Sequence, residues 1–403
     1  MEPKIRFKGF EGEWKETNFK SFGHVAMCKR IFKHQTSPDG DVPFYKIGTF
    51  GSEPDAYISQ SLFEEYKKKY SFPNKGDILI SAAGTIGRTV EYNGENCYYQ
   101  DSNIVWLAHN NNITNGFLKQ LYSIVKWSSL EGATIKRLYN SNILETSFYI
   151  PQKAEQQAIA SYFTSLDSQI STSTSRLASL KQMKAASLQA MFPQEGETVP
   201  KIRFNGFEGE WKTCVLSSIA TMHARIGWQN LRKDEFLSSG DYYLITGTDF
   251  HDGKISFETC HYIAKERYDQ DKNIQLEIDS ILITKDGTLG KVAFVDSLDK
   301  PATLNAGVFN VRTKDKEIYP KYLFQYLKAP YLMDYVNKNA TGGTIKHLNQ
   351  NMLVNFPVQH PSYKEQVMIG DYLFNLDRQI SLQSQRLEKQ KQIKSACLDK
   401  MFV

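Results

Sequence analysis

A thirteen-residue segment near the start of the chain occurs a second time, almost unchanged, about half-way along it. Residues 3–15, PKIRFKGFEGEWK, return as residues 200–212, PKIRFNGFEGEWK, and only Lys8 is replaced, by Asn205. An identity of this length does not arise by chance, so the chain of 403 residues is one unit made twice. Each unit of about 200 residues is large enough to form its own hydrophobic core, which excludes a solenoid of small stacked repeats.

The correspondence between the two halves continues beyond this motif. Residues 77–88, DILISAAGTIGR, match residues 280–291, SILITKDGTLGK, and residues 134–138, TIKRL, match residues 344–348, TIKHL. Residues 154–192 and 364–402 agree at many spaced positions, and both stretches end in Met-Phe. Each half therefore consists of a diverged body followed by a better-kept tail.

The bodies have the pattern of mixed α/β domains. Short apolar runs that lead into Gly-containing turns predict buried strands at residues 78–80 and 281–283, and further strands are predicted at 103–107 and 307–312. Helices are predicted at residues 116–128 and 320–337. We therefore expect an α+β fold with a first globular domain at residues 1–150, a long helix at 151–193, a linker and second globular domain at 194–360, and a second long helix at 361–403.

The tails are predicted to be long helices that pair with each other. Residues 154–192 contain neither Pro nor Gly, and Pro193 ends the stretch. Partly apolar residues recur at alternating four- and three-residue steps, the spacing of a coiled-coil seam with polar interruptions. The seam positions are Leu166, Ile170, Ser173, Leu177, Leu180, Lys184, Ser187 and Met191 in the first tail and Leu376, Ile380, Gln383, Leu387, Gln390, Lys394, Cys397 and Met401 in the second. Such a helix is about 58 Å long, and we favour antiparallel pairing because parallel pairing needs a long return connection.

Composition limits the function without fixing it. The net charge is +5, from 49 Lys and Arg against 44 Asp and Glu, which permits nucleic-acid binding but does not require it. The sequence has no stretch suited to a membrane span and no apolar core of a signal peptide near its start, so we expect a cytoplasmic protein without a membrane partner. The five cysteines are scattered and the eight histidines lack metal-ligand spacing, so neither a disulfide framework nor a metal site is expected.

Motifs for catalysis are largely missing. The sequence has no Asn/Asp-Pro-Pro-Tyr/Phe segment of an amino-methyltransferase and no G-x-G-x-x-G, and residues 287–292, GTLGKV, are too short for a phosphate loop. Asp55, Glu65 and Lys67 fit a loose metal-nuclease spacing, in which carboxylates hold Mg²⁺ and the lysine supports the attacking water. The second half does not keep this pattern. A nuclease is therefore a weaker alternative, as is a two-headed scaffold that binds proteins through its aromatic-rich bodies.

The remaining pattern suits DNA. The Gly-containing turns at residues 81–88 and 284–291 are predicted to expose backbone N–H groups beside a basic residue, which favours phosphate contacts. Residues 134–137 and 344–347 add a second basic patch to each body, and residues 29–33 and 225–230 offer side chains able to pair with base edges. The candidate DNA-binding residues are Lys29, Arg30, Lys33, Ser81, Thr85, Arg88, Lys136, Arg137, Arg225, Trp228, Gln229, Asn230, Thr284, Lys285, Asp286, Thr288, Lys291, Lys346 and His347.

Together these segments resemble the specificity subunits of type I restriction–modification enzymes, over the whole chain. The resemblance is carried by FEGEWK at residues 10–15 and 207–212, by the strand and turn at 281–291, by IKHL at 345–348, and by Pro followed by Glu-Gln where the chain enters each long helix. Ala82-Ala83 stands where the second half has Lys285-Asp286, a departure that weakens the DNA contact expected of the first turn.

The resemblance implies a subunit with no catalytic residue, metal or cofactor of its own. Each body would be a target-recognition domain that reads one half of a split target in double-stranded DNA, and the helical rod would set the gap between the halves. Two modification subunits would bind S-adenosylmethionine and methylate adenine, and restriction subunits would use ATP and Mg²⁺ for cleavage. The modification subunits are expected to dock on the outer faces of the helices.

Overall fold

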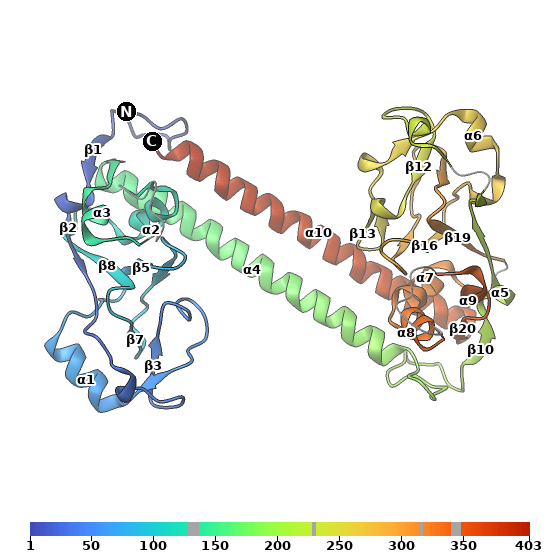
Figure 1. Cartoon of the computed structure of the whole chain (residues 1–403), viewed down its shortest axis with the longest axis horizontal. Helices are drawn as coiled ribbons and strands as arrows, with labels where there is room; N and C mark the ends of the chain where they lie inside the picture. Colours follow the sequence, from blue (N-terminus) through green and yellow to red (C-terminus); the bar gives the residue numbers. More distant parts are fainter. Residues whose placement is uncertain (128–136, 228–230, 315–316, 340–347) are drawn as a thin grey trace. The chain divides into compact units, whose positions relative to one another are not determined.

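The computed structural model describes residues 1–127, 137–227, 231–314, 317–339 and 348–403. The chain divides into two compact units, and each unit holds one end of each long helix (Figure 1). Unit 1 comprises residues 1–174 together with 386–403, and unit 2 comprises residues 175–385. The two ends of the chain therefore belong to the same unit.

Unit 1 is built from a four-stranded and a three-stranded sheet. The four-stranded sheet is antiparallel, with the order β2 (Gly23–Ala26), β8 (Ile104–His109), β5 (Ile78–Ser81) and β6 (Thr89–Glu91). The three-stranded sheet has the order β4 (Tyr57–Ile58), β3 (Val42–Tyr45) and β7 (Tyr98–Tyr99), and β3 and β7 run parallel. A two-stranded ladder pairs β1 (Lys15–Asn18) with β9 (Ser147–Ile150). The helices of this body are α1 (Gln60–Lys69), α2 (Asn115–Ile124) and α3 (Asn140–Glu145).

Unit 2 repeats this strand order. Its four-stranded antiparallel sheet is β11 (Ala220–Ala224), β19 (Val308–Thr313), β16 (Ile281–Thr284) and β17 (Val292–Phe294), and its three-stranded sheet is β15 (His261–Tyr262), β12 (Tyr243–Ile245) and β18 (Ala302–Leu304). The ladder of β10 (Lys212–Val215) with β20 (Pro357–His360) corresponds to that of β1 with β9, and a hairpin joins β13 (Phe250–His251) to β14 (Lys254–Ile255). The helices are α5 (Leu216–Ile219), α6 (Lys265–Asp269), α7 (Pro320–Lys328), α8 (Tyr331–Lys338) and α9 (Gln350–Val354).

The strands predicted from the apolar runs are confirmed as β5, β16, β8 and β19. Two predicted helices are shorter than expected. The helix predicted at residues 116–128 is α2, which begins after the N-cap Thr114 and ends at Ile124. The single helix predicted at residues 320–337 is wrong, because α7 ends at Lys328 and Pro330 precedes a separate helix, α8. Proline lacks the N–H that would continue α7, and its ring clashes with the preceding turn.

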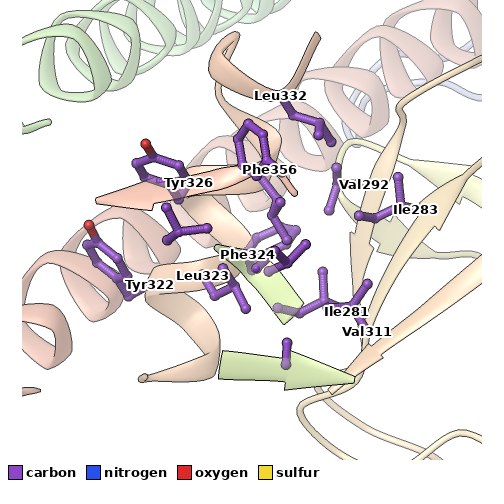
Figure 2. Close-up of a cluster of buried hydrophobic side chains, with 14 of the residues drawn as sticks. Ile281, Ile283, Val292, Val311, Tyr322, Leu323, Phe324, Tyr326, Leu332 and Phe356 are labelled. Atoms are coloured by element: carbon purple, nitrogen blue, oxygen red, sulfur yellow. The ribbon is translucent and has the colours of Figure 1, made fainter. Parts of the chain in front are cut away.

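One inner strand of each large sheet, β5 in unit 1 and β16 in unit 2, is buried on both faces, which explains its unbroken apolar sequence. Ile281 and Ile283 of β16 face a core formed with α7, α8 and Phe356 (Figure 2), whereas Leu282 faces a second core of the same unit. In β5, residues 78 and 80 lie in one core and residue 79 in the other. Side chains alternate between the faces of a strand, so an apolar run without alternation indicates a core on each side.

The long helices are confirmed with nearly the predicted bounds. They are α4 (Lys153–Met191) and α10 (Tyr363–Met401), each of 39 residues (Figure 1). In unit 1, Asp167 of α4 contacts Lys394 of α10 at 2.6 Å. Tyr162, which precedes Asp167 on α4, contacts Cys397, which follows Lys394 on α10. The two helix segments are therefore antiparallel there, as predicted.

The same direction holds in unit 2. Lys184 of α4 forms an ion pair with Asp377 of α10, and Ser187, three residues later on α4, reaches Tyr372, five residues earlier on α10, at 3.3 Å. The predicted seam residues of both helices are buried or half-buried. Lys184–Asp377 and Lys394–Asp167 occupy corresponding places in the two halves, so the lysine in each seam is paired with a carboxylate of the other long helix.

The ion pair of unit 2 has a second lysine. The ammonium of Lys328, on α7, lies 3.1 Å from Asp377, and Gln325 donates a hydrogen bond of 2.8 Å to the other oxygen of that carboxylate. Burial, reinforced by the charge of Lys328, lowers the pKa of Lys184 to about 8. Two ammonium groups thus share one carboxylate in unit 2.

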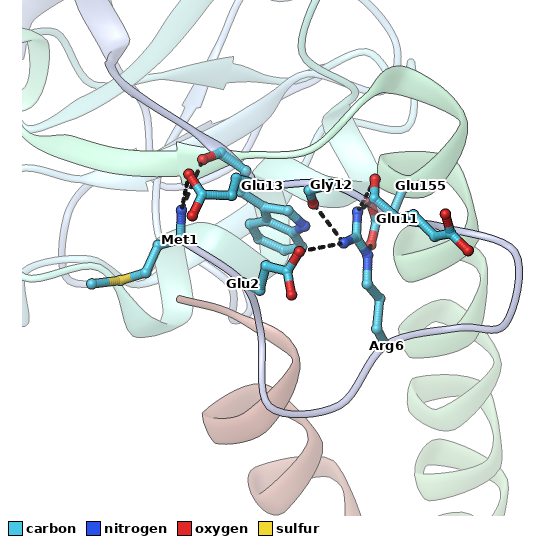
Figure 3. Close-up of polar contacts among 8 residues, drawn as sticks. Met1, Glu2, Arg6, Glu11, Gly12, Glu13 and Glu155 are labelled. Carbon is cyan, nitrogen blue, oxygen red and sulfur yellow. Dashed lines mark hydrogen bonds and ion pairs between the residues drawn. The ribbon is translucent and has the colours of Figure 1, made fainter.

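The arginine of the repeated motif attaches each body to the start of a long helix. Figure 3 shows the first copy: Arg6 forms two parallel contacts of 2.8 Å with Glu155 of α4 and donates a hydrogen bond of 2.6 Å to the carbonyl of Gly12. In the second copy, Arg203 binds Glu365 of α10 at 2.7 and 2.8 Å and donates a hydrogen bond of 2.6 Å to the carbonyl of Gly209. A planar guanidinium matches a carboxylate in this way, which a lysine cannot reproduce.

The same motif closes over the far end of the other long helix. In unit 1 the backbone N–H of Ile5 donates to the last turn of α10 at Lys400, and the Trp14 ring packs against Phe402. In unit 2 the backbone N–H of Ile202 donates to the last turn of α4 at Ala190, and the corresponding Trp packs against Phe192. The repeated motif and the Met-Phe ends are therefore parts of one structural joint, formed once in each unit.

Candidate nucleic-acid interface

The Gly-containing turns have the same internal hydrogen bonds in both units. Thr284 is fully buried, its hydroxyl donates to the carbonyl of Thr288, and it accepts a hydrogen bond of 2.9 Å from the N–H of Lys291. Ser81 is equally buried and makes the equivalent bonds to Thr85 and Arg88. The prediction that these two hydroxyls contact DNA is therefore corrected, because both are used to shape the turn.

Several backbone N–H groups of the turns are also used internally. Those of Gly87 and Gly290 donate to the carbonyls of residues 81 and 284, and those of residues 88 and 291 bond the hydroxyls named above. Gly87 and Gly290 have φ values of 82° and 73°, a conformation that favours glycine. These four amides are not free to bind phosphate, so that part of the prediction is corrected as well.

The tips of the turns remain exposed. Thr85 and Arg88 in unit 1, and Thr288 and Lys291 in unit 2, have exposed side chains. One terminal nitrogen of the Arg88 guanidinium, Nη1, also donates a hydrogen bond of 2.6 Å to the carbonyl of Phe50, which holds this side of the group against the body. Each turn thus presents one hydroxyl and one cation on a fixed backbone, a suitable pair for a phosphate group.

In unit 1, basic residues from distant parts of the sequence meet at residues 101–103. Arg30 forms an ion pair of 2.8 Å with Asp101, and Arg137 donates a hydrogen bond of 3.2 Å to the carbonyl of Ser102. The backbone of the first turn joins them, because the N–H of Ala82 donates to Asn103 at 2.7 Å. The predicted segments at 29–33 and 81–88 and the described residue Arg137 are therefore brought to one place by a connection that the sequence did not single out.

Two further lysines flank this cluster. Lys29 is exposed, with its ammonium 5.1 Å from the ring of Tyr70, and its carbonyl accepts a hydrogen bond of 3.1 Å from Tyr98. Lys33 is exposed as well. Arg30 remains 60% exposed in its side chain despite its ion pair, so it too is available to a ligand.

In unit 2 the equivalent meeting point is the connection between β18 and β19. The N–H of Lys285 donates to Gly307 at 2.9 Å, and the half-buried side chain of this lysine places its ammonium 5.6 Å from the Phe309 ring. Asp286, the next residue, is half-buried. Arg225 reaches the end of β18, where its Nε donates to the carbonyl of Leu304 at 2.9 Å.

Arg225 does not serve as an exposed base-reading residue. It is 2% exposed, and burial, with the nearby charge of Arg267, lowers the pKa of its guanidinium. The prediction that Arg225 contacts DNA is therefore corrected: the side chain lies in the interior of unit 2. Six further predicted DNA contacts lie outside the described residues: Lys136, Trp228, Gln229, Asn230, Lys346 and His347.

Sequence reasoning missed Asp101 and Ser102 in unit 1 and Asn305 in unit 2. Asn305 bonds the N–H of Ala306 at 2.8 Å with its own side chain, and Ser102 has a φ of 51°. Asp, Ser and Asn followed closely by a strand are turn-forming residues. That signal was present in the sequence. It predicts a turn, but it does not predict which distant residues contact that turn.

The residues of the nuclease alternative are engaged elsewhere. Asp55 forms an ion pair with Lys46 at 2.8 Å and Glu65 with Lys69 at 2.9 Å, and Lys67 lies over aromatic rings. Among the residues that the structure describes, no group of three or more His, Cys, Asp or Glu side chains could hold a metal ion. The structure therefore gives the nuclease alternative no support.

Two other features of the described residues bear on chemistry and location. Burial raises the pKa of Cys28, Cys97 and Cys260 to about 12, so these thiols stay protonated at neutral pH and are poor nucleophiles. No helix within the described ranges is long and apolar enough to cross a membrane.

Comparison with known proteins agrees with the duplicated fold. Residues 11–182 and 208–392 each match the family described as type I restriction modification DNA specificity domain. A protein of Haemophilus influenzae assigned as a type I restriction enzyme specificity subunit is 59% identical over 140 residues, which are 34% of this chain and 36% of that protein. The EcoBI specificity subunit of Escherichia coli is 22% identical over 253 residues, 59% of this chain and 53% of that subunit.

A solved structure shares the fold over the full length. The S subunit of a type I restriction–modification system from M. genitalium superposes with a TM-score of 0.66 at 17% sequence identity, covering 100% of this chain and 99% of that one. The curated relatives are matched over only about a third and a half of their own lengths. The two family matches nevertheless span most of the sequence, and the chain belongs to the family of type I restriction modification DNA specificity domains, of which it carries two copies.

Proposed function

We propose that this chain is the DNA sequence-specificity subunit of a type I restriction–modification complex, and that it is not itself an enzyme. The observation that carries the proposal is the presence of two specificity domains, each with an exposed cation at the end of the equivalent Gly-containing turn, Arg88 in unit 1 and Lys291 in unit 2. Each body acts as a target-recognition domain and reads one half of a split target in double-stranded DNA. The division of labour is physical: contacts to phosphate position the protein, and contacts to base edges select the sequence.

In unit 1 the phosphate contacts fall to Arg88 at the turn and to Lys29 and Arg30 beside it. In unit 2 they fall to Lys285 and Lys291. The two long helices hold the gap between the half-sites constant, because a continuous helix is a stiff spacer. Two bodies that read one face of B-DNA favour half-site centres about 34 Å apart, one turn of the duplex.

The chemistry of the complex belongs to partner subunits. Two modification subunits bind S-adenosylmethionine and methylate adenine, and restriction subunits use ATP and Mg²⁺ to cleave, all in the cytoplasm. The modification subunits dock on the outer faces of the helices. Met183 on α4 and Ile393 on α10 support this, because they occupy corresponding positions of the two halves and are 50% and 40% exposed. An exposed apolar side chain at both places suits a partner that binds twice.

A methylation map tests the proposal. The chain is co-expressed with a matching modification subunit in a host without adenine methylation, and modified adenines are read by single-molecule sequencing. The expected result is a split motif with two fixed halves and a constant gap. Replacing residues 14–150 with those of another such domain should change one half only. A change in both halves, or no methylation from a stable complex, would overturn the proposal.

A further inference from the structure

A buried phenylalanine holds an equivalent place in the two units. Tyr45 at the end of β3 and Ile245 at the end of β12 correspond, because the carbonyl of each accepts a hydrogen bond of 2.9 Å from the residue that follows the neighbouring parallel strand. Phe50 and Phe250 lie five residues further on, and both are buried. The segments that follow these two rings therefore start from the same point of the fold.

Both segments lie beside the exposed cation at the end of the Gly-containing turn. In unit 1 the carbonyl of Phe50 accepts the 2.6 Å hydrogen bond of Arg88, and a Cβ at Gly51 would lie 4.0 Å from the Arg88 side chain. In unit 2 the residues from Phe250 to Gly253 line a hollow of about 440 Å³ together with Lys291. The segment and the cation are thus neighbours in each unit.

The segment itself differs between the units. In unit 1, residues 46–56 connect β3 to β4 without forming a strand. In unit 2, the longer connection of residues 246–260 contains the β13–β14 hairpin. The place of the cation is kept while its neighbour has changed. Two bodies that read different half-sites need such an arrangement, because phosphates are the same in every DNA sequence and base edges are not.

The hairpin of unit 2 is held in a fixed position. Its strands leave only Asp252 and Gly253 between them, with φ values of 52° and 86°, the positive values that a type I′ turn requires. The ammonium of Lys328 donates a hydrogen bond of 3.1 Å to the carbonyl of Asp252, and the N–H of Phe294 donates one of 3.0 Å to that of Gly253. The turn is therefore anchored to α7 and β17.

The side chains at the tip of the hairpin are available to a ligand. His251 and Asp252 are exposed, and within the described ranges neither side chain forms a hydrogen bond or an ion pair. Two lysines line the same hollow: Lys291, which is exposed, and Lys328, which is already paired with Asp377. A DNA phosphate that approaches this face is therefore met by Lys291.

An exposed carboxylate on a DNA-binding face has few possible partners. It is repelled by phosphates and can only accept hydrogen bonds, so its partner in DNA is an amino group of a base. In the major groove, cytosine N4 and adenine N6 carry such groups, and this groove is wide enough for a two-stranded ribbon. The imidazole of His251 offers an N–H to an acceptor of a neighbouring base, such as guanine N7 or O6.

We infer that the tip of the β13–β14 hairpin reads bases for unit 2. Asp252 accepts a hydrogen bond from a cytosine or adenine amino group in the major groove, and His251 donates one to an adjacent base. Lys291 binds the phosphate backbone beside them. This inference rests on the proposed function, which supplies the DNA, and it names residues that select the sequence. Residues 46–56 of unit 1 form no such hairpin, so the two side chains act on one half of the target only.

The test measures base discrimination by the purified complex of the full chain with its modification subunits. The wild-type motif is first mapped by methylation, and the half read by unit 2 is the one that stays the same when residues 14–150 are exchanged. Duplexes that carry the motif, and duplexes with each single-base change in it, are then titrated by fluorescence anisotropy. The ratio of the two dissociation constants gives the discrimination at each position.

Asp252→Asn removes the charge and keeps a side chain that tolerates positive φ. It should lower discrimination at one position of the unit 2 half by about fivefold to a hundredfold, and His251→Ala should do so at an adjacent position. Asp279→Asn is the matched control. Asp279 is exposed, has a φ of 68° and does not line the hollow, so it loses the same charge from a similar backbone. The control should discriminate like the wild type, and thermal unfolding of all complexes should agree.

Each outcome has a distinct meaning. If the hairpin variants discriminate like the wild type, or weaken binding equally for every duplex, the inference is overturned and the proposed function is untouched. A relaxed position in the unit 1 half, or the same relaxation in Asp279→Asn, would overturn it as well. If the wild type yields no split motif from a stable complex, the proposed function fails together with the inference.

Discussion

Replacing Arg203 with alanine is expected to destabilise unit 2 by about 3–5 kcal/mol, the cost of removing one partner from a buried ion pair. Glu365 is fully buried, and the Arg203 side chain is 15% exposed. The carboxylate would lose two charged hydrogen bonds of 2.7 and 2.8 Å and remain shut away from water. The carbonyls of Glu208 and Gly209 would also lose their donor. Burying an unpaired charge is what makes the loss large.

Urea unfolding of the full chain measures this cost, and hydrogen exchange assigns it to a unit. Arg203→Lys should recover only part of the stability, because an ammonium cannot form the parallel pair of bonds. The double variant Arg203→Met with Glu365→Met should be more stable than Arg203→Ala, since no buried charge is left unpaired. Arg6→Ala is the matched test in unit 1, where the geometry with Glu155 is nearly identical.

The reasoning would be refuted by either of two results. One is a loss of less than about 1 kcal/mol in Arg203→Ala, the range of an ordinary surface ion pair. The other is a double variant no more stable than Arg203→Ala, which would show that the unpaired carboxylate is not the source of the cost.

Three further predictions concern the seam, the turn and the interface. Because burial lowers the pKa of Lys184 to about 8, the unfolded chain binds that proton more tightly, and stability should rise as pH increases from about 8 toward about 10.4. Lys184→Met should abolish this rise in urea unfolding at a series of pH values, whereas Lys394→Met, at the more exposed equivalent position, should keep it. Thr284→Val should cost about 1–3 kcal/mol in thermal unfolding, because a backbone N–H of the turn loses its acceptor; unchanged stability would contradict the role given to this hydroxyl. Lys285→Ala should weaken binding to all duplex sequences and lower the salt slope by about one, and an unchanged slope would remove Lys285 from the phosphate contacts.

The parts of the fold that depend on local pattern were predictable. The seam spacing gave both long helices within a residue or two, and the apolar runs gave β5 and β16, because helix and strand periodicities are properties of neighbouring residues. The error at residues 320–337 is also local. Pro330 follows α7 directly and should have divided the predicted helix.

The candidate site was harder to predict, because side-chain exposure is a tertiary property. Ser81 and Thr284 are hydroxyl-bearing residues at a glycine turn, a pattern that suits either a phosphate contact or an internal hydrogen bond. Both side chains are buried in the structure, so their hydroxyls form internal hydrogen bonds. Arg225 looked like a base-reading residue in sequence but lies inside unit 2. Arg30 and Asp101, which form an ion pair, are 71 residues apart in the sequence, so no local spacing pattern could predict their contact.

The sequence by itself determined that the chain is a duplicated α+β unit with two paired long helices, because repetition and periodicity are visible along the chain. Only the tertiary structure decided which copy of the motif meets which helix end. The first copy caps α10 at Lys400, and the second caps α4 at Ala190. Both motifs carry the same residues except at Lys8 and Asn205, and the residues that form the joint are identical, so their sequence cannot choose between the two helix ends. The antiparallel pairing of the helices makes the choice, by returning the end of α10 to the unit in which α4 begins.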